Sequence, residues 1–313
     1  MGQFLAKRLS SMLLAFFGLT VIAFGLMRII PVDPVEAYFI MNQMPISEEA
    51  LETMREEEGY NRPLLVQYSA WLLDAVTLDF GKSFVSKKPV TEELLQRFHV
   101  TLILAASAFI TIVTVSFTVG IWSATKRGGF IDWLSRSFIY TLASMPSFWL
   151  AFIFVYIVAL KWGLLPLMGW GSVAHVILPA GTLALGFIPY YIRLIRSSML
   201  EELNKPHVVF ARARGVKESV IIRRHVVKGI IPQLVTSLAI TCGGLLGGAA
   251  IIEIVFTISG VGRYIVESML ARDYFVIQGF IVLIGGLYII FNFVADMLCA
   301  MVDPRVRVKG DGA

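Results

Sequence analysis

The sequence predicts an all-α integral membrane protein with six transmembrane helices. Of its 313 residues, 57% are hydrophobic and only 16% are charged, whereas a soluble domain carries about 25% charged residues. Inside a bilayer only helices and closed barrels satisfy all their backbone hydrogen bonds. The apolar runs are far longer than the roughly 10-residue strands of a barrel and do not alternate in polarity, so they predict helices.

Each expected span is an apolar run of about 20 residues, the length that crosses a bilayer. The first run follows a basic start and has no cleavage site, so we expect a retained span. The chain divides into residues 1–30 (N-terminus and first span), 31–99 (external helical cap), 100–301 (spans two to six, with a loop at 196–228) and 302–313 (tail). The spans are expected at residues 9–30, 100–124, 138–160, 175–195, 231–256 and 275–301.

The distribution of basic residues predicts the orientation in the membrane. They gather at the N-terminus, in the segments between spans two and three and between spans four and five, and in the tail. The remaining short loops hold only Lys161, Arg263 and Arg272. The positive-inside rule therefore places both termini and loop 196–228 in the cytoplasm. The net charge of +5 reflects this topology rather than nucleic-acid binding.

The polar segment 31–99 is expected to fold into a small external cap. Ser47 is a suitable N-cap for one helix and Gly59 a suitable stop. Pro63 opens a second, amphipathic helix.

No catalytic or metal-binding constellation is apparent in the sequence. Gly81-Lys82-Ser83 resembles the end of a phosphate-binding loop, but Val76 stands where that loop requires a glycine. The histidines have no ligand spacing, so isolated polar roles are favoured over a preformed metal site. If this protein pumps a solute, another subunit must supply the energy.

The few ionisable residues inside the spans are informative because such residues are costly there. Glu253 in span five is too short to reach far toward water, so an interior-facing or subunit-pairing role and a purely structural role are both open. Arg28 lies near the end of span one, and its long side chain is expected to extend to the membrane–water interface.

Small and helix-breaking residues mark spans four and five. In span five, Gly243 with Gly247 and Gly244 with Gly248 form two small-xxx-small spacings that allow close approach of another helix, either within the chain or at an interface. In span four, Pro179 and Pro189 are expected to bend the helix or line a cavity.

The stretch "HVVFARARGVKES", residues 207–219, predicts a short helix beneath the membrane. Val209, Ala213 and Val216 follow i, i+4, i+7 spacing, and Gly215 can end the helix. Docking on anionic lipid and docking on a protein are equally compatible with this pattern.

The longer stretch "EELNKPHVVFARARGVKESVIIRRH" resembles the ATPase-coupling loop of bacterial ABC importer permeases. "GYNRPLLVQYSAWLLDAVTLDFGKSF", "SMPSFWLAF", "HVILPAGTLALG", "EIVFTISGVGRY", "RDYFVIQG" and "DPRVR" narrow the resemblance to the dipeptide, oligopeptide and nickel branch. It implies a type I permease fold in the bacterial cytoplasmic membrane. The coupling residues carried over are Glu202, His207, Ala211, Arg212, Ala213, Arg214 and Gly215; those of the pathway or permease interface are Pro179, Pro189, Gly243, Gly244, Gly247, Gly248 and Glu253.

The resemblance also implies partners: a second related permease, two ABC ATPase subunits that bind ATP and Mg²⁺, and an extracytoplasmic solute-binding protein. No cofactor is expected on this chain. Pro206-His207 replaces the acidic residue and tyrosine of many peptide importers, which favours nickel or a metal chelate as cargo, with short peptides as the alternative. Prolines usual near Ser259 and Phe275 are missing. An ATPase-independent transporter or channel would need inverted repeats and a chain of buried charges, and neither is evident.

Overall fold

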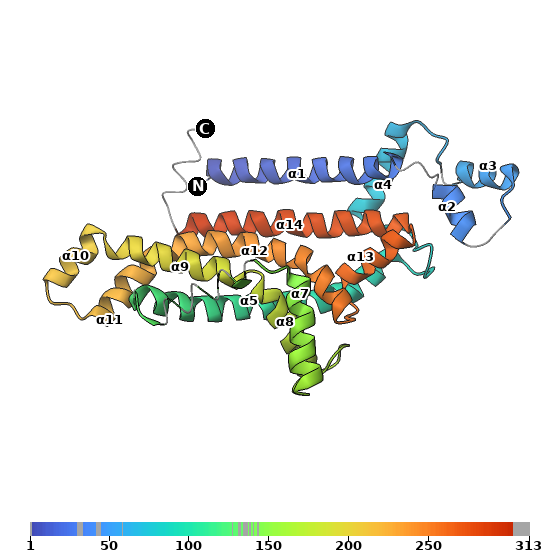
Figure 1. Ribbon diagram of the computed structural model, residues 1–313. Coiled ribbons are helices and arrows are strands. Elements are labelled where there is room, and N and C mark those ends of the chain that lie inside the picture. The colour runs from blue at the N-terminus through green and yellow to red at the C-terminus, as the bar shows by residue number, and fades with distance from the viewer. Residues whose placement is uncertain are drawn as a thin grey trace. The chain divides into compact units, whose positions relative to one another are not determined.

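A computed structural model describes residues 2–29, 34–41, 45–57, 59–126, 128–130, 133, 137, 139, 141–142 and 144–302 (Figure 1). Its regular elements are helices, and the described residues include one isolated antiparallel bridge, between Lys82 and Pro89. The all-helical expectation is thereby confirmed. The predicted tail at 302–313, which carries the "DPRVR" motif, lies outside the described residues except for Val302.

The chain forms two compact units, each built from two stretches of sequence. One contains residues 1–100 and 260–293, and the other contains residues 101–259 and 294–313. We call them the cap unit and the loop unit, because the first includes the predicted cap and the second includes loop 196–228.

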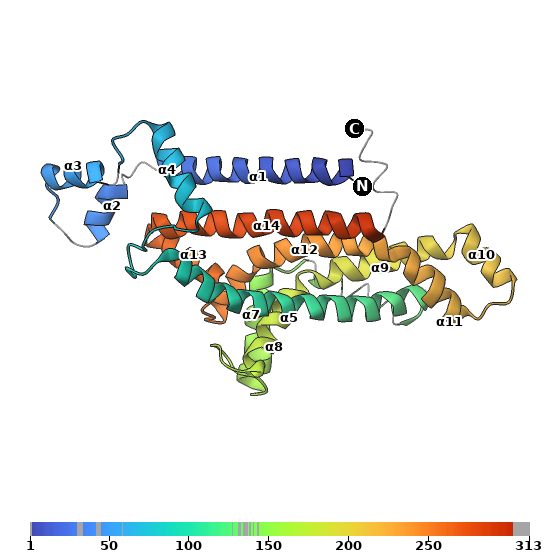
Figure 2. The same ribbon diagram turned by 180° about the vertical axis from the view of Figure 1, so that it is seen from behind.

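The cap unit holds the helices of the predicted cap and those that come before and after it in the chain. They are α1 (Gly2–Ile29), α2 (Pro34–Met41), α3 (Glu48–Glu57), α4 (Leu64–Val76), α13 (Val261–Leu270), the start of α5 (Val90–Thr125) and most of α14 (Tyr274–Val302). Both views show α1 beside α14 (Figures 1 and 2). A side chain at Gly285 of α14 would meet Leu19 of α1, so a small residue there permits the close approach.

The cap helices begin and end where local chemistry requires. The Ala50 N–H donates to Ser47 Oγ at 3.2 Å, which is the predicted N-cap. Gly59 has φ +72°, a left-handed conformation suited to glycine at a helix end. Ala75, Phe80, Leu94, Val261 and Val276 then form a buried core that joins α4, α5, α13 and α14.

The loop unit contains the rest of α5 and the helices of the middle of the chain. They are α7 (Ser147–Phe154), the π-helix η1 (Val155–Lys161), α8 (Val173–Leu185), α9 (Ile188–Leu203), α10 (Pro206–Ala213), α11 (Glu218–Ile221), the π-helix η2 (Ile222–Val226) and α12 (Val227–Val255). The chain doubles back at α10 and α11, drawn in yellow to orange in Figures 1 and 2.

Four described stretches are long and apolar enough to cross a membrane: Phe4–Ile29, Val90–Thr125, Glu218–Val255 and Tyr274–Leu298. The α8–α9 pair makes a fifth if its 54° bend lies within one span. The third expected span, 138–160, begins at a residue outside the described ranges, and α7 and η1 form its continuous described part. The helix that contains the second expected span, α5, starts at Val90, ten residues before that span. Pro89 precedes it, and Glu92 and Glu93 suit a helix N-terminus.

Candidate functional site

Loop 196–228 folds back against its own unit through one face of α10. Val208 is fully buried and Ala211 is 9% exposed. Both pack with Met199 of α9 and with Ile221 and Val226, which follow α10 in the chain. The short helix is therefore anchored by the helices on either side of it.

The turn after α10 is a Schellman motif. Gly215 has φ +75°, its N–H donates to Arg212 O at 3.0 Å, and the Val216 N–H donates to Ala211 O at 3.3 Å. Val216 also packs on the cluster that contains Ala211, which is the hydrophobic contact that accompanies this motif. The predicted stop at Gly215 is confirmed.

A bidentate ion pair braces this turn. Arg212 Nη2 lies 2.7 Å and Nε 3.1 Å from the two carboxylate oxygens of Glu218. The hydrogen bonds and charge of Glu218 raise the pKa of Arg212. Both side chains are about half exposed, so solvent screening leaves the pair with a modest energetic contribution and a mainly orienting role.

Glu202 ties the start of α10 to α9. Its side chain is 7% exposed and lies 2.5 Å from Lys205 Nζ and 3.4 Å from His207 Nε2. Gly229 of α12 leaves room for this carboxylate, because a β-carbon there would lie 2.5 Å from Glu202 Cδ. The structure thus brings the predicted residues Glu202 and His207 together, and His207 supports the geometry of the loop.

The opposite face of α10 is open. Val209 is 52% and Phe210 64% exposed, and Ala213 and Arg214 are exposed beside them. We call Val209, Phe210, Ala213 and Arg214 the outward face. Of the predicted coupling residues, Ala211 lies on the buried face instead, and Phe210 was missed although its size and position next to the motif could have indicated it.

The predicted prolines shape the fourth expected span. Pro179 lies inside α8 and is buried, and Pro189 is buried in the first turn of α9. The break between the two helices, which carries Gly186 and Phe187, bends the chain by 54°. The expected bend is present just before Pro189, which cannot supply a backbone donor, whereas Pro179 is accommodated inside α8.

The glycines of α12 face in two directions. A β-carbon on Gly248 would lie 3.5 Å from Leu183, and one on Gly244 3.7 Å from Phe187, so both glycines lie near the α8–α9 pair. Gly244 and Gly247 are exposed, Gly243 and Gly248 are half-buried, and Gly247 has nothing within 4 Å of an added β-carbon. Internal packing accounts for Gly248, whereas Gly244 and Gly247 also leave an open surface on the unit.

Glu253 is completely buried near the end of α12. Thr101 of α5 donates its hydroxyl to Glu253 Oε1 at 2.5 Å, which supplies a hydrogen bond for a group that is costly to bury. Just beyond it, the Ile258 N–H donates to Glu253 O at 2.8 Å, and Thr257 has φ +53°. Glu253 therefore faces the interior of the unit.

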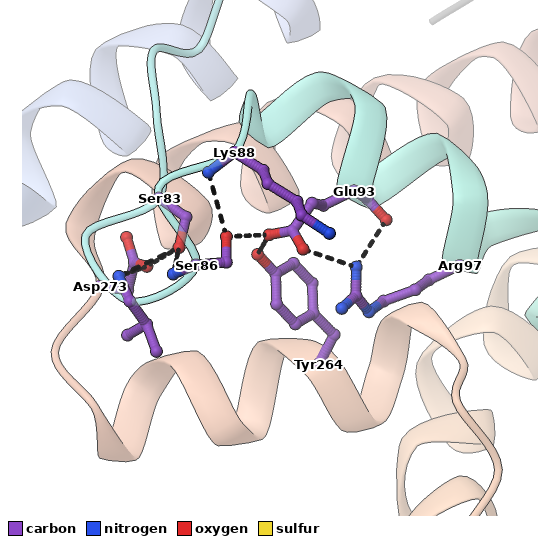
Figure 3. A network of polar contacts seen from close by, with 8 residues as sticks. Ser83, Ser86, Lys88, Glu93, Arg97, Tyr264 and Asp273 are labelled. Atoms are coloured by element: carbon purple, nitrogen blue, oxygen red, sulfur yellow. Dashed lines mark hydrogen bonds and ion pairs between the residues drawn. The ribbon is translucent and has the colours of Figure 1, made fainter.

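A second polar network organises the predicted cap (Figure 3). Ser83 Oγ donates to Asp273 Oδ2 at 2.6 Å, and the Val85 N–H donates to the same oxygen at 3.3 Å. Gly81 has φ +73°, and the Val90 N–H donates to its carbonyl at 2.9 Å. The "GKS" stretch is thus a loop held on Asp273.

Glu93 forms the other half of this network. It accepts from the hydroxyls of Ser86, at 2.7 Å, and Tyr264, and it pairs with Arg97 at 3.3 Å. Arg97 also lies 4.0 Å over the Tyr264 ring. Burial and the hydrogen bond to Glu93 raise the pKa of Tyr264 well above its usual range, so its hydroxyl stays a donor.

The spans, the bent α8–α9 pair and the anchored loop define a multi-pass membrane protein. Comparison with known proteins shows its family. Residues 116–308 match the description "Binding-protein-dependent transport system inner membrane component", and residues 1–105 match the N-terminal part of such membrane components. The chain belongs to this family of ABC importer permeases, as its motifs indicated.

Two curated relatives cover nearly the whole chain. The metal-staphylopine import system permease protein CntB of Staphylococcus aureus (strain NCTC 8325 / PS 47) is 32% identical over 98% of this chain and 99% of its own length. The dipeptide transport system permease protein DppB of Escherichia coli (strain K12) is 32% identical over 99% and 100%. A solved structure, "Inward facing conformations of the MetNI methionine ABC transporter", shares the fold with a TM-score of 0.57 and 21% identity over 67% of this chain and 96% of that one.

Proposed function

We propose that this permease and a second related permease form the membrane pathway of an ATP-driven importer, energised by two ABC ATPase subunits and supplied by an extracytoplasmic solute-binding protein. The observation that carries the proposal is α10: one face is anchored in the unit and the other presents an exposed phenylalanine beside exposed cations. ATP and Mg²⁺ are bound by the partners. On this proposal the partners carry the chemistry, and this chain carries the pathway.

The geometry of the loop suits mechanical coupling. A helix that must transmit a push needs a fixed angle to its neighbours, and the Glu202 contacts, the Schellman turn and the Arg212–Glu218 pair each restrict that angle. A groove on an ATPase would bury the apolar part of the outward face, and Arg214 would supply orientation. With loop 196–228 in the cytoplasm, both termini are cytoplasmic as well.

The substitution Phe210→Glu tests this function. A charge on the outward face opposes burial against a partner without touching the anchored face, so ATP-dependent uptake should fall severely while membrane insertion is unchanged. Phe130→Glu is the matched control, because Phe130 is 72% exposed in another segment expected on the cytoplasmic side. Uptake that survives loss of the ATPases would instead indicate a secondary transporter or a channel.

For the cargo we propose nickel or a metal chelate, with dipeptides as the alternative. The likeness to CntB supports the first and that to DppB supports the second. His207 no longer favours a metal, because Glu202 of its own loop accounts for it. Deletion of the gene, followed by measurement of cell nickel, cobalt and zinc and of growth on dipeptides, separates the two: a metal deficit with normal peptide use supports the first.

We also propose that Pro179, Pro189 and the exposed glycines of α12, Gly244 and Gly247, shape the pathway or the permease interface. Gly244 and Gly247 offer an open, small-residue surface for close helix packing. Glu253, which is internal to the unit, holds the end of α12 against α5.

A further inference from the structure

The cap unit contains two adjoining cavities that the proposed function does not use. One has a volume of about 180 Å³ and the other about 470 Å³, the latter within the usual range for small-molecule pockets. Tyr60, Trp71, Asp74, Phe275 and Gln278 line both. Aromatic walls with a few polar groups are typical of sites for small amphipathic molecules.

Arg28 lines the smaller cavity, where its contacts are with neutral side chains. One of its N–H groups donates to Gln67 Oε1, and its guanidinium lies 5.1 Å from the ring centroids of both Phe24 and Tyr60. In the part of the chain that the structure describes, no carboxylate lies within ion-pair distance of Arg28. Its remaining donors suit a planar anion.

Gln67 holds Arg28 in place. Its side-chain amide donates to the carbonyls of Tyr60 at 2.8 Å and Arg62 at 2.7 Å. With its nitrogen engaged in this way, its oxygen is directed toward the guanidinium. The cation is therefore positioned by the fold of the cap, instead of extending freely into water.

Tyr274 supplies an independent indication of a ligand. It lines the same cavity, is only 5% exposed, and its buried hydroxyl has no hydrogen-bond partner among the described residues. A buried hydroxyl without a partner is unfavourable, so this position calls for an acceptor. Arg28 and Tyr274 together offer donors to one small cavity.

We propose that this cavity binds the carboxylate of an amphipathic solute on its way through the importer, with the solute's apolar part against Trp71 and Phe275. Asp74, which lines both cavities, is placed to attract a cationic group of the same molecule. Short peptides and amino-acid metal chelates both carry such carboxylates. The proposal rests on the proposed function, because only transport brings these solutes to this chain.

The test measures binding to the assembled transporter in nanodiscs, without ATP and without the solute-binding protein. The probes are the dipeptide Ala-Phe, its carboxamide analogue and the nickel–histidine chelate. Loss of the carboxylate should weaken binding by about 10- to 100-fold, the range for hydrogen bonds to a charged group. Tyr274→Phe and Arg28→Gln should each do the same for the carboxylate probes.

Tyr274→Phe is the sharper variant, because it removes a hydroxyl without a partner and leaves the fold intact. Tyr288→Phe, on the same helix and outside both cavities, is its control and should bind normally. Equal affinity for Ala-Phe and its carboxamide, or no binding of any probe, overturns the inference. Preference for Ala-Phe or for the chelate identifies the source of the carboxylate. If the probes bind as expected but the transporter shows no ATP-dependent uptake, the proposed function is refuted and the inferred binding site stands.

Discussion

Gly229 in α12 lies so close to Glu202 that an added methyl group forces the carboxylate to move. A β-carbon at this position would lie 2.5 Å from Glu202 Cδ and 3.0 Å from Cγ, well inside van der Waals contact. Overpacking of this kind costs about 1–3 kcal/mol. Displacement of the carboxylate would also weaken its contacts with Lys205 and His207.

Gly247→Ala provides the comparison, because Gly247 lies in the same helix and nothing lies within 4 Å of its added β-carbon. Both substitutions gain the same helix propensity, about 1 kcal/mol, so that term cancels in the difference. Gly229→Ala should therefore be less stable than Gly247→Ala by about 1–3 kcal/mol. The assay is denaturant-induced unfolding of the purified chain in mixed micelles.

A double variant separates the steric effect from general damage to α12. Glu202→Ala removes the side chain that the new methyl group meets, so adding Gly229→Ala to it should cost little further stability, and the two substitutions should be strongly non-additive. Equal stability of the Gly229→Ala and Gly247→Ala chains, or additive losses in the double variant, would refute the reasoning.

Four further substitutions probe a strained turn and two buried hydrogen bonds. Thr257→Gly should stabilise the chain by about 1 kcal/mol in thermal unfolding, because a β-branched residue at φ +53° is strained; unchanged stability would mean that the turn is relaxed. Asp273→Asn should destabilise the loop around Ser83 by about 1–3 kcal/mol, because an amide oxygen accepts a weaker hydrogen bond from Ser83 than a carboxylate does. Proteolysis near Ser83 should then become faster, and an unchanged rate would contradict this role of Asp273. Glu253→Ala should reduce uptake and stability, with Thr101→Val showing part of the loss; normal uptake and stability in both would refute the tie between α5 and α12.

Much of the architecture follows from local sequence rules. Ser47, Gly59 and Gly215 take the cap and stop positions that their chemistry favours. The bend before Pro189 follows because proline cannot complete a helical hydrogen-bond ladder. Such features depend on a few neighbouring residues and are therefore visible without tertiary structure.

The buried face of α10 could not be derived in the same way. Residues 208–211 are four apolar or small residues in a row, so the periodicity of an eight-residue helix does not select one face. The i, i+4, i+7 rule favoured Val209 and Ala213, whereas contacts with α9 and η2 bury Val208 and Ala211. The face left open became apparent only once those packed neighbours were known.

The polar networks of the cap unit could not be predicted from sequence patterns, because their partners lie far apart in the chain. Ser83 and Asp273 are 190 residues apart, and Glu93 and Tyr264 are 171 apart. The position of Arg28 likewise becomes informative only beside the buried hydroxyl of Tyr274. Each depends on which helices fold together, which no local spacing encodes.

The central claim is that the outward face of α10 contacts an ATPase subunit. A photoreactive phenylalanine analogue in place of Phe210, in the intact transporter, should cross-link to the ATPase on illumination, and the same analogue in place of Phe130 should not. Cross-linking from position 210 to lipid alone, or equal cross-linking to the ATPase from both positions, would contradict the account.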